Sequence, residues 1–162
     1  DETACPVAAI YAISFVGSSR SVRLEPEAVL NCAFTERLDE FVGKVAEPAA
    51  VEMLDGTLTR LHIAGSYVCR TRNGQPDAPP SEHGLANAID ISAFELEDGR
   101  IVSVEADWDG EGAAGDFLRH VHEAACGPFT TVLGPEADSH HQDHLHLDLQ
   151  RRGADGRTTF CQ

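Results

Sequence analysis

Histidines and carboxylates are concentrated near the end of the chain. Residues 139–148 hold four histidines and two aspartates. If the second half of this segment is a β-strand, alternation places His144, His146 and Asp148 on one face and the intervening leucines on a face that suits a core. Imidazole nitrogens and carboxylate oxygens are ligands that zinc binds in proteins. We therefore predict a metal site here, in preference to a cluster of solvated loop histidines.

A second segment, residues 81–90, carries two more potential ligands. His83 and Asp90 are seven residues apart, with glycine and alanines between them. Small residues let the backbone pass close to another element or a ligand. Taken singly, His83 suits a surface loop and Asp90 suits a turn. Because a catalytic zinc needs three protein ligands and an open position, we predict that His83, Asp90 and His146 bind one zinc ion together.

Length and charge narrow the class of protein. The 162 residues suit one domain over 1–162. With 12 basic and 27 acidic residues, the net charge of -15 argues against a nucleic-acid partner, which would need a basic surface. No apolar run approaches the roughly 20 residues of a membrane helix, so we expect no membrane insertion. The sequence begins at Asp1 without an initiator Met, and we expect that a leader was removed or trimmed.

The five cysteines favour an oxidising compartment. None forms a CxxC pair, which argues against a cysteine zinc site. Wide spacing in an acidic, lysine-poor chain is typical of structural disulfides, so we predict a periplasmic or extracellular location. An odd number leaves one thiol free or paired elsewhere. We predict a Cys5–Cys32 bridge, with Cys161 joined to Cys69 or Cys126, a choice that the sequence leaves open.

The periodicity of apolar residues predicts an α+β fold. We expect a helix that begins at Pro26, near its first helical position, and runs to Val45, where Pro48 soon interrupts it. His120 and His122, two apart on an expected helix, do not face one site and receive no metal role. The other expected elements are a short helix over 49–54, strands over 58–70, 89–96, 101–104, 130–133 and 145–149, a turn at 98–99, and a helix over 116–126. Helices first and hairpin-linked strands later predict N-terminal helices packed on a small antiparallel sheet that carries the zinc site.

Four groups of residues resemble the bacterial extensin-like C-terminal domain family: 67–74, 81–84 with 87–90, 132–135, and 141–148. The resemblance covers nearly the whole chain. That family is related to the LAS group of zinc peptidases, which includes D-Ala-D-Ala carboxypeptidases and peptidoglycan endopeptidases. The LAS pattern SxHxxGxAxD is matched at Ser81, His83, Ala88 and Asp90, whereas Ala86 stands where the pattern has glycine. The later HxH pattern is matched at 144–146.

This resemblance implies zinc on His83, Asp90 and His146. The general base is then Asp143, three positions before the last ligand, or His141, five positions before it. On a regular strand Asp143 and His146 would point to opposite faces, so a bulge or loop before His144 would be needed.

Other residues receive supporting roles from the same resemblance. His144 would stabilise the oxyanion, and Asp148 would orient an imidazole. Arg70, with Arg72 in reserve, would bind a substrate carboxylate.

The resemblance implies zinc-dependent hydrolysis of an amide bond in a peptidoglycan stem peptide or crosslink, by a DD-endopeptidase or a carboxypeptidase. Stem peptides would be the partner, and an activating protein is left open. The alternative is a non-catalytic, zinc-containing cell-wall-binding module, which would have a filled fourth zinc position or no base. A metal-dependent oxygenase fits poorly, because iron sites commonly show His-x-Asp/Glu. HExxH is absent, which excludes a thermolysin-like design.

Overall fold

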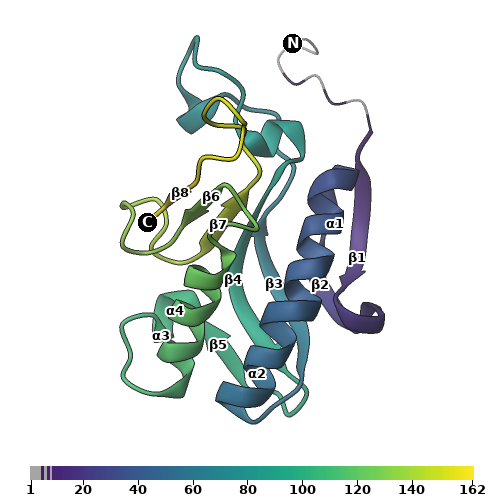
Figure 1. Cartoon of the computed structure of the whole chain (residues 1–162), viewed down its shortest axis with the longest axis vertical. Helices are drawn as coiled ribbons and strands as arrows, with labels where there is room; N and C mark the ends of the chain where they lie inside the picture. The colour runs from purple at the N-terminus through teal and green to yellow at the C-terminus, as the bar shows by residue number, and fades with distance from the viewer. Residues whose placement is uncertain (1–4, 6, 8) are drawn as a thin grey trace.

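A mixed β-sheet forms the centre of the computed structural model, which describes residues 5, 7 and 9–162 (Figure 1). In this part of the chain eight strands pair in the order β1-β2-β3-β4-β7-β6-β8, and β5 pairs with β4. Their bounds are β1 Tyr11–Val16, β2 Val22–Leu30, β3 Leu58–Gly65, β4 Ala88–Leu96, β5 Ile101–Ser103, β6 Thr131–Leu133, β7 Leu145–Asp148 and β8 Phe160–Cys161. The sheet is larger than predicted and not wholly antiparallel, because β2 pairs with β3 and β6 pairs with β8 in parallel.

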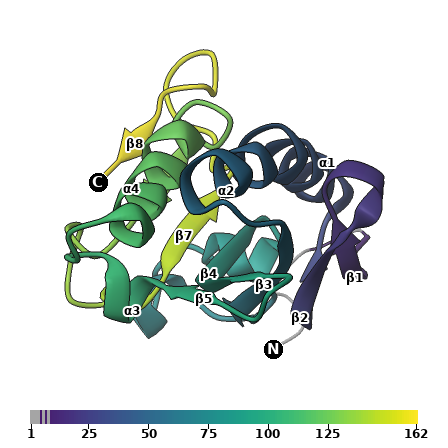
Figure 2. The ribbon, with the colours of Figure 1, turned by 90° about the horizontal axis from the view of Figure 1, so that it is seen from below.

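Helices cover one face of this sheet. The helical segments are α1 Cys32–Phe41, the π-helical η2 Val42–Ala46, α2 Glu47–Leu54, α3 Val104–Asp107, α4 Ala113–Ala125, and the 3₁₀ turns η1 Ser18–Arg20, η3 Arg72–Gly74 and η4 Glu82–Leu85. Figure 2 shows α1, α2 and α4 on the same side of the strands. Phe94 of β4 and Phe117 of α4, both fully buried, meet edge to face with ring centres 5.2 Å apart. The predicted α+β class is therefore confirmed at the level of a large sheet with few helices. Within the described residues, no helix is long and apolar enough to cross a membrane.

Among the described residues, β1 and β2 precede α1, and the prediction of a helix from Pro26 to Val45 is wrong in its first part. Residues 22–30 form β2, and Asn31 caps α1 by accepting a hydrogen bond from Phe34 N at 2.8 Å. Val22, Leu24, Ala28 and Leu30 of β2 are buried. Pro26 lies outside the paired residues of both ladders, where its missing N–H costs nothing.

The second predicted helix is confirmed with a small shift. Pro48 stands in the first turn of α2, directly after the wider turns of η2, so the helical path continues from α1. A proline at this position leaves few hydrogen bonds unmade. The predicted strand over 58–70 ends earlier, because β3 stops at Gly65.

The predicted Cys5–Cys32 bridge is wrong. The disulfides are Cys5–Cys69 and Cys126–Cys161, and Cys32 is a free, exposed thiol at the start of α1. Of the two partners left open for Cys161, the fold selects Cys126. Sequence proximity misled the prediction, because β8 pairs with β6 near Cys126 and the sulfur of Cys5 lies against Gly84.

Candidate metal centre

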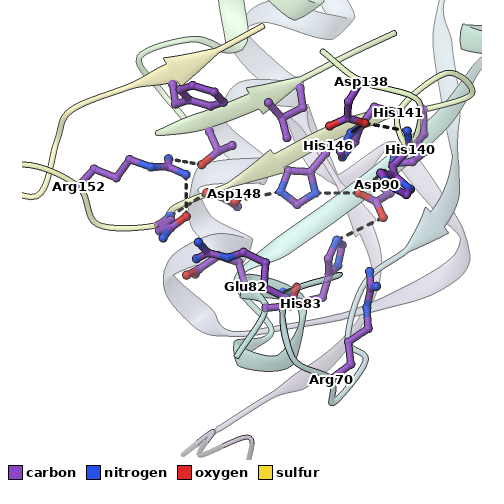
Figure 3. A pocket seen from close by; sticks show the side chains of 17 residues that line it. Arg70, Glu82, His83, Asp90, Asp138, His140, His141, His146, Asp148 and Arg152 are labelled. Atoms are coloured by element: carbon purple, nitrogen blue, oxygen red, sulfur yellow. Dashed lines mark hydrogen bonds and ion pairs between the residues drawn. The ribbon is translucent and has the colours of Figure 1, made fainter. Parts of the chain in front are cut away.

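The three predicted zinc ligands converge on one point. His83 Nε2 lies 3.2 Å from Asp90 Oδ2, and His146 Nδ1 lies 2.9 Å from Asp90 Oδ1. One ligand atom from each residue can be chosen so that all three lie within 4.8 Å of one another. Figure 3 shows the two imidazoles pointing at the same carboxylate. This arrangement can bind a cation through two nitrogens and a carboxylate.

Strand pairing positions two of these ligands. Asp90 of β4 is the antiparallel partner of His146 of β7, so both side chains project from the same face of the sheet. Ile89 and Leu147 are also paired, and they are buried in the hydrophobic core on the opposite face. The alternation read from the sequence is thus the reason that the ligand side chains avoid the core.

His83 reaches the site from η4. Its Nδ1 lies 2.6 Å from the carbonyl oxygen of Ser66, so Nδ1 donates and Nε2 is left to face Asp90. Ser81 begins this turn by accepting a hydrogen bond from His83 N at 3.3 Å. The turn ends at Ala86 with φ 51° and ψ 33°, the left-handed region that favours glycine. Ala86, which replaces the glycine of the LAS pattern, therefore has the left-handed backbone conformation that a glycine would adopt easily.

Asp148 holds the far side of the second imidazole. His146 Nε2 lies 2.9 Å from Asp148 Oδ2, while Asp148 Oδ1 accepts from Gln150 N at 2.9 Å. Both His146 and Asp148 are buried. Because Nε2 donates to Asp148, the nitrogen that faces Asp90 is Nδ1.

The charges of the cluster stabilise one another. Burial, the largest influence, raises the pKa of Asp90, but the hydrogen bonds and charges of His146 and His83 outweigh it and hold that pKa well below its ordinary value. Burial lowers the pKa of His146, but the hydrogen bonds to Asp148 and Asp90 outweigh it and raise the pKa to about 9. Without a metal ion, a proton shared with these carboxylates fills the position that a cation would take.

Two more histidines surround this centre. His144 Nε2 lies 3.6 Å from Asp90 Oδ1. The ring of His141 lies 5.1 Å from that of His144 and 5.8 Å from that of His146, measured between ring centres. Burial lowers the pKa of His141, although its hydrogen bond to Asp138 acts in the opposite direction.

The two candidate bases differ in their surroundings. His141 lines the cavity and its Nδ1 lies 2.7 Å from Asp138 Oδ1, which fixes the ring and leaves Nε2 free to accept a proton. Asp143 is 66% exposed, does not line the cavity, and is engaged by His144 Nδ1 at 2.8 Å. Residues 139–143 form turns, so the loop required to turn Asp143 is present, but it brings His141 and not Asp143 to the cavity.

A cavity of about 450 Å³ opens over the cluster. Arg70 and Arg72, the predicted carboxylate-binding residues, both line it and are exposed. Glu82, Asp138, Arg152 and Phe160 are among the lining residues that the sequence analysis did not predict. The spacing of three residues between Asp138 and His141 could have indicated that these two side chains meet. No local pattern indicated Arg152.

Comparison with known proteins places the chain in a family. The chain belongs to the family described as extensin-like protein C-terminus, whose model matches residues 1–162. No curated protein and no solved structure matches the chain.

Proposed function

We propose that this protein is a zinc-dependent peptidase that hydrolyses an amide bond in peptidoglycan stem peptides or in their crosslinks. The observation that carries the proposal is the convergence of His83, Asp90 and His146 at a polar cavity, with His141 and His144 beside them. The same residues match the LAS pattern, and the proposal includes a relationship to those peptidases.

The donor set suits zinc. Two imidazoles and one carboxylate leave a fourth position for water or substrate, as in catalytic zinc sites. Ser66 and Asp148 fix the ring nitrogens that face away from the centre, the arrangement that metal-binding histidines require. Zinc, when bound, supplies Lewis acidity toward an amide carbonyl and lowers the pKa of water.

The chain's own residues would move the protons. In the proposed reaction His141 takes a proton from the attacking water at Nε2 and returns it to the leaving amine, while Asp138 holds Nδ1. Asp143 is the less favoured base because its carboxylate is exposed and engaged by His144. His144 already donates from Nδ1 to Asp143, so it would donate from Nε2 to the developing oxyanion in its protonated form.

Substrate and location follow from the cavity walls and the disulfides. Arg70, supported by Arg72, binds a carboxylate of the peptide at the cavity rim. Two disulfides support action in the periplasm or outside the cell. Either a crosslink or a terminal residue would satisfy this arrangement, so both endopeptidase and carboxypeptidase action are included.

A second candidate is a zinc-containing module that binds the cell wall without turnover. One observation favours it: His144 Nε2 is 3.6 Å from Asp90 Oδ1, close enough for a fourth nitrogen to fill the open zinc position after a small movement. In that case His144 would be a ligand and water would be excluded.

Metal analysis and digestion of muropeptides in one preparation test both candidates. The peptidase predicts about one zinc per chain and a single class of cleaved peptide bond by mass spectrometry. If the protein contains zinc and binds muropeptides without cleaving them, and if His144→Ala then gains cleavage, the results would favour the module. Protein that binds no zinc would contradict both.

A further inference from the structure

A third arginine, Arg152, lines the cavity from the C-terminal arm, defined as residues 149–162. Figure 3 shows Arg152 at the left, beyond Asp148 and His146, and Arg70 at the lower right, next to His83 and Asp90. The cavity therefore has a cationic group on each side of the candidate metal centre. This placement raises the question of what Arg152 binds.

Neutral groups hold Arg152 in place. Its Nη1 donates to the hydroxyl of Thr131 and, at 3.4 Å, to the carbonyl of Thr130, and its Nη2 donates to Gln150 Oε1 at 2.6 Å. Its guanidinium carbon lies 5.6 Å from the centre of the Phe160 ring. A guanidinium has five N–H donors, so Nε–H and one Nη2–H remain for a ligand.

The carboxylates of the cavity have other partners. Among the described residues, no carboxylate lies within 4.0 Å of the Arg152 nitrogens. Asp90, Asp138 and Asp148 are hydrogen-bonded to imidazoles. Glu82, which feels the charge of Arg152 at longer range, bonds to Asn87 Nδ2 at 2.7 Å. The positive charge of Arg152 is consequently not neutralised by an ion pair.

The fold also anchors the C-terminal arm that carries Arg152. β8, at the end of the arm, pairs with β6, and the Cys126–Cys161 disulfide joins it to the end of α4. Arg70 and Arg72, by contrast, are exposed. A guanidinium that is already ordered loses little conformational entropy when it binds an anion.

We infer that Arg152 forms a second anion-binding subsite, which binds a substrate carboxylate on the side of the scissile amide opposite to Arg70. This inference rests on the proposed function for its substrate class. It narrows that class to peptides that carry a carboxylate on each side of the cleaved bond. The exposed ring of Phe160 would contact the apolar part of the same peptide residue.

Two crosslinked stem peptides of identical sequence provide the test. They differ only at the carboxylate that the inference assigns to Arg152, which is free in one peptide and amidated in the other. For the unmodified protein, amidation should raise KM about tenfold, because a charge-assisted hydrogen bond is lost. Arg152→Gln should raise KM for the free peptide about tenfold and leave the amidated peptide nearly unaffected, with kcat changed by less than about threefold. Arg152→Lys should restore part of the preference.

The neighbouring Arg151 is the matched control, because it is exposed and does not line the cavity. Arg151→Gln should leave both peptides unaffected, and zinc content should be unchanged in every variant. If the role of Arg152 is purely structural, Arg152→Gln should lower the unfolding temperature and raise KM equally for both peptides. Equal loss for both peptides would overturn the inference.

Equilibrium binding by calorimetry separates this inference from the proposed function. If the zinc-loaded protein cleaves neither peptide but binds the free one more tightly, and Arg152→Gln removes that difference, the subsite stands and the peptidase fails. If both peptides are cleaved with equal KM, the peptidase stands and the subsite fails.

Discussion

Strand β4 carries two histidine–carboxylate clusters, and they differ in how the carboxylate is neutralised. Near its end, Glu95 lies 3.2 Å from Arg60 Nη1 and 2.7 Å from His62 Nε2. Near its start, Asp90 has only imidazoles as partners, and no lysine or arginine of the described residues lies within ion-pair distance of it. Arginine is permanently charged, so Glu95 forms a complete structural ion pair. Imidazoles can give up their protons, so a metal ion can replace the protons that lie between Asp90 and its histidines.

A bulge puts both clusters on the face away from the helices. The pairing of β4 with β3 shifts between Ile63↔Ile91 and His62↔Ala93, which adds one residue to β4. On a regular strand, two residues five apart point to opposite faces, so the bulge is what brings Asp90 and Glu95 to one face. The same types of residue on one face thus produce two different sites, and the presence of an arginine separates them.

Removal of a zinc ligand should have the largest effect. His83→Ala, Asp90→Ala and His146→Ala should each weaken zinc binding by at least about a hundredfold, because only two ligands would remain. Zinc per chain after dialysis is the measurement. The matched control is His62→Ala in the Glu95 cluster, which should keep its zinc. Retention of one zinc in any of the first three variants would refute the ligand set.

Loss of the general base should have the next largest effect. His141→Ala should lower kcat by roughly a hundredfold or more and keep the zinc. Asp138→Asn should reduce kcat less, by about tenfold, since it only orients the ring. Stopped assays of peptide cleavage measure both. If Asp143→Ala, and not His141→Ala, removes the activity, the role of base belongs to Asp143.

The pH dependence of zinc affinity should distinguish the Asp90 cluster from the Glu95 cluster. In the metal-free protein the pKa of His146 is raised to about 9, so between its ordinary value and about 9 zinc must displace a proton. The zinc Kd should therefore fall about tenfold per pH unit over this range and then level off.

Stability without zinc should change in the opposite sense. The contribution of protonated His146 is complete below its unfolded pKa and is lost as pH rises through about 9, so unfolding temperature in chelator should fall over this range. Chelator competition and thermal unfolding measure the two trends, and His62→Ala should leave both unchanged. A Kd independent of pH would contradict the shared proton.

The smallest effect is expected at the structural ion pair. Glu95→Gln should lower the free energy of unfolding by about 1 kcal/mol, because the pair is only partly buried. Urea denaturation is the measurement, and zinc content should remain that of the unmodified protein. Loss of zinc in this variant would mean that the two clusters are coupled.

Local sequence patterns determined part of the fold and the donor residues of the candidate metal site. The alternation at 144–148 fixed which side chains avoid the core, and the His83–Asp90 spacing identified two further candidate ligands that the structure places beside His146. The turn at 98–99, the strands β4 and β5 on either side of it, and helix α4 also followed from short-range chemistry, whereas the short helix α3 was not predicted. The N-terminal helix was misplaced because Val29 and Leu30 fit both a helical face and the end of a strand.

Tertiary structure alone decided which distant groups meet. Disulfide pairing, the approach of Asp138 to His141, the role of Ser66 and the position of Arg152 depend on long-range packing, which no local period encodes. The sequence determined the donor chemistry, because alternation on a strand is a property of adjacent residues. The fold decided what surrounds those donors, because a cavity is lined by segments that are far apart in the chain.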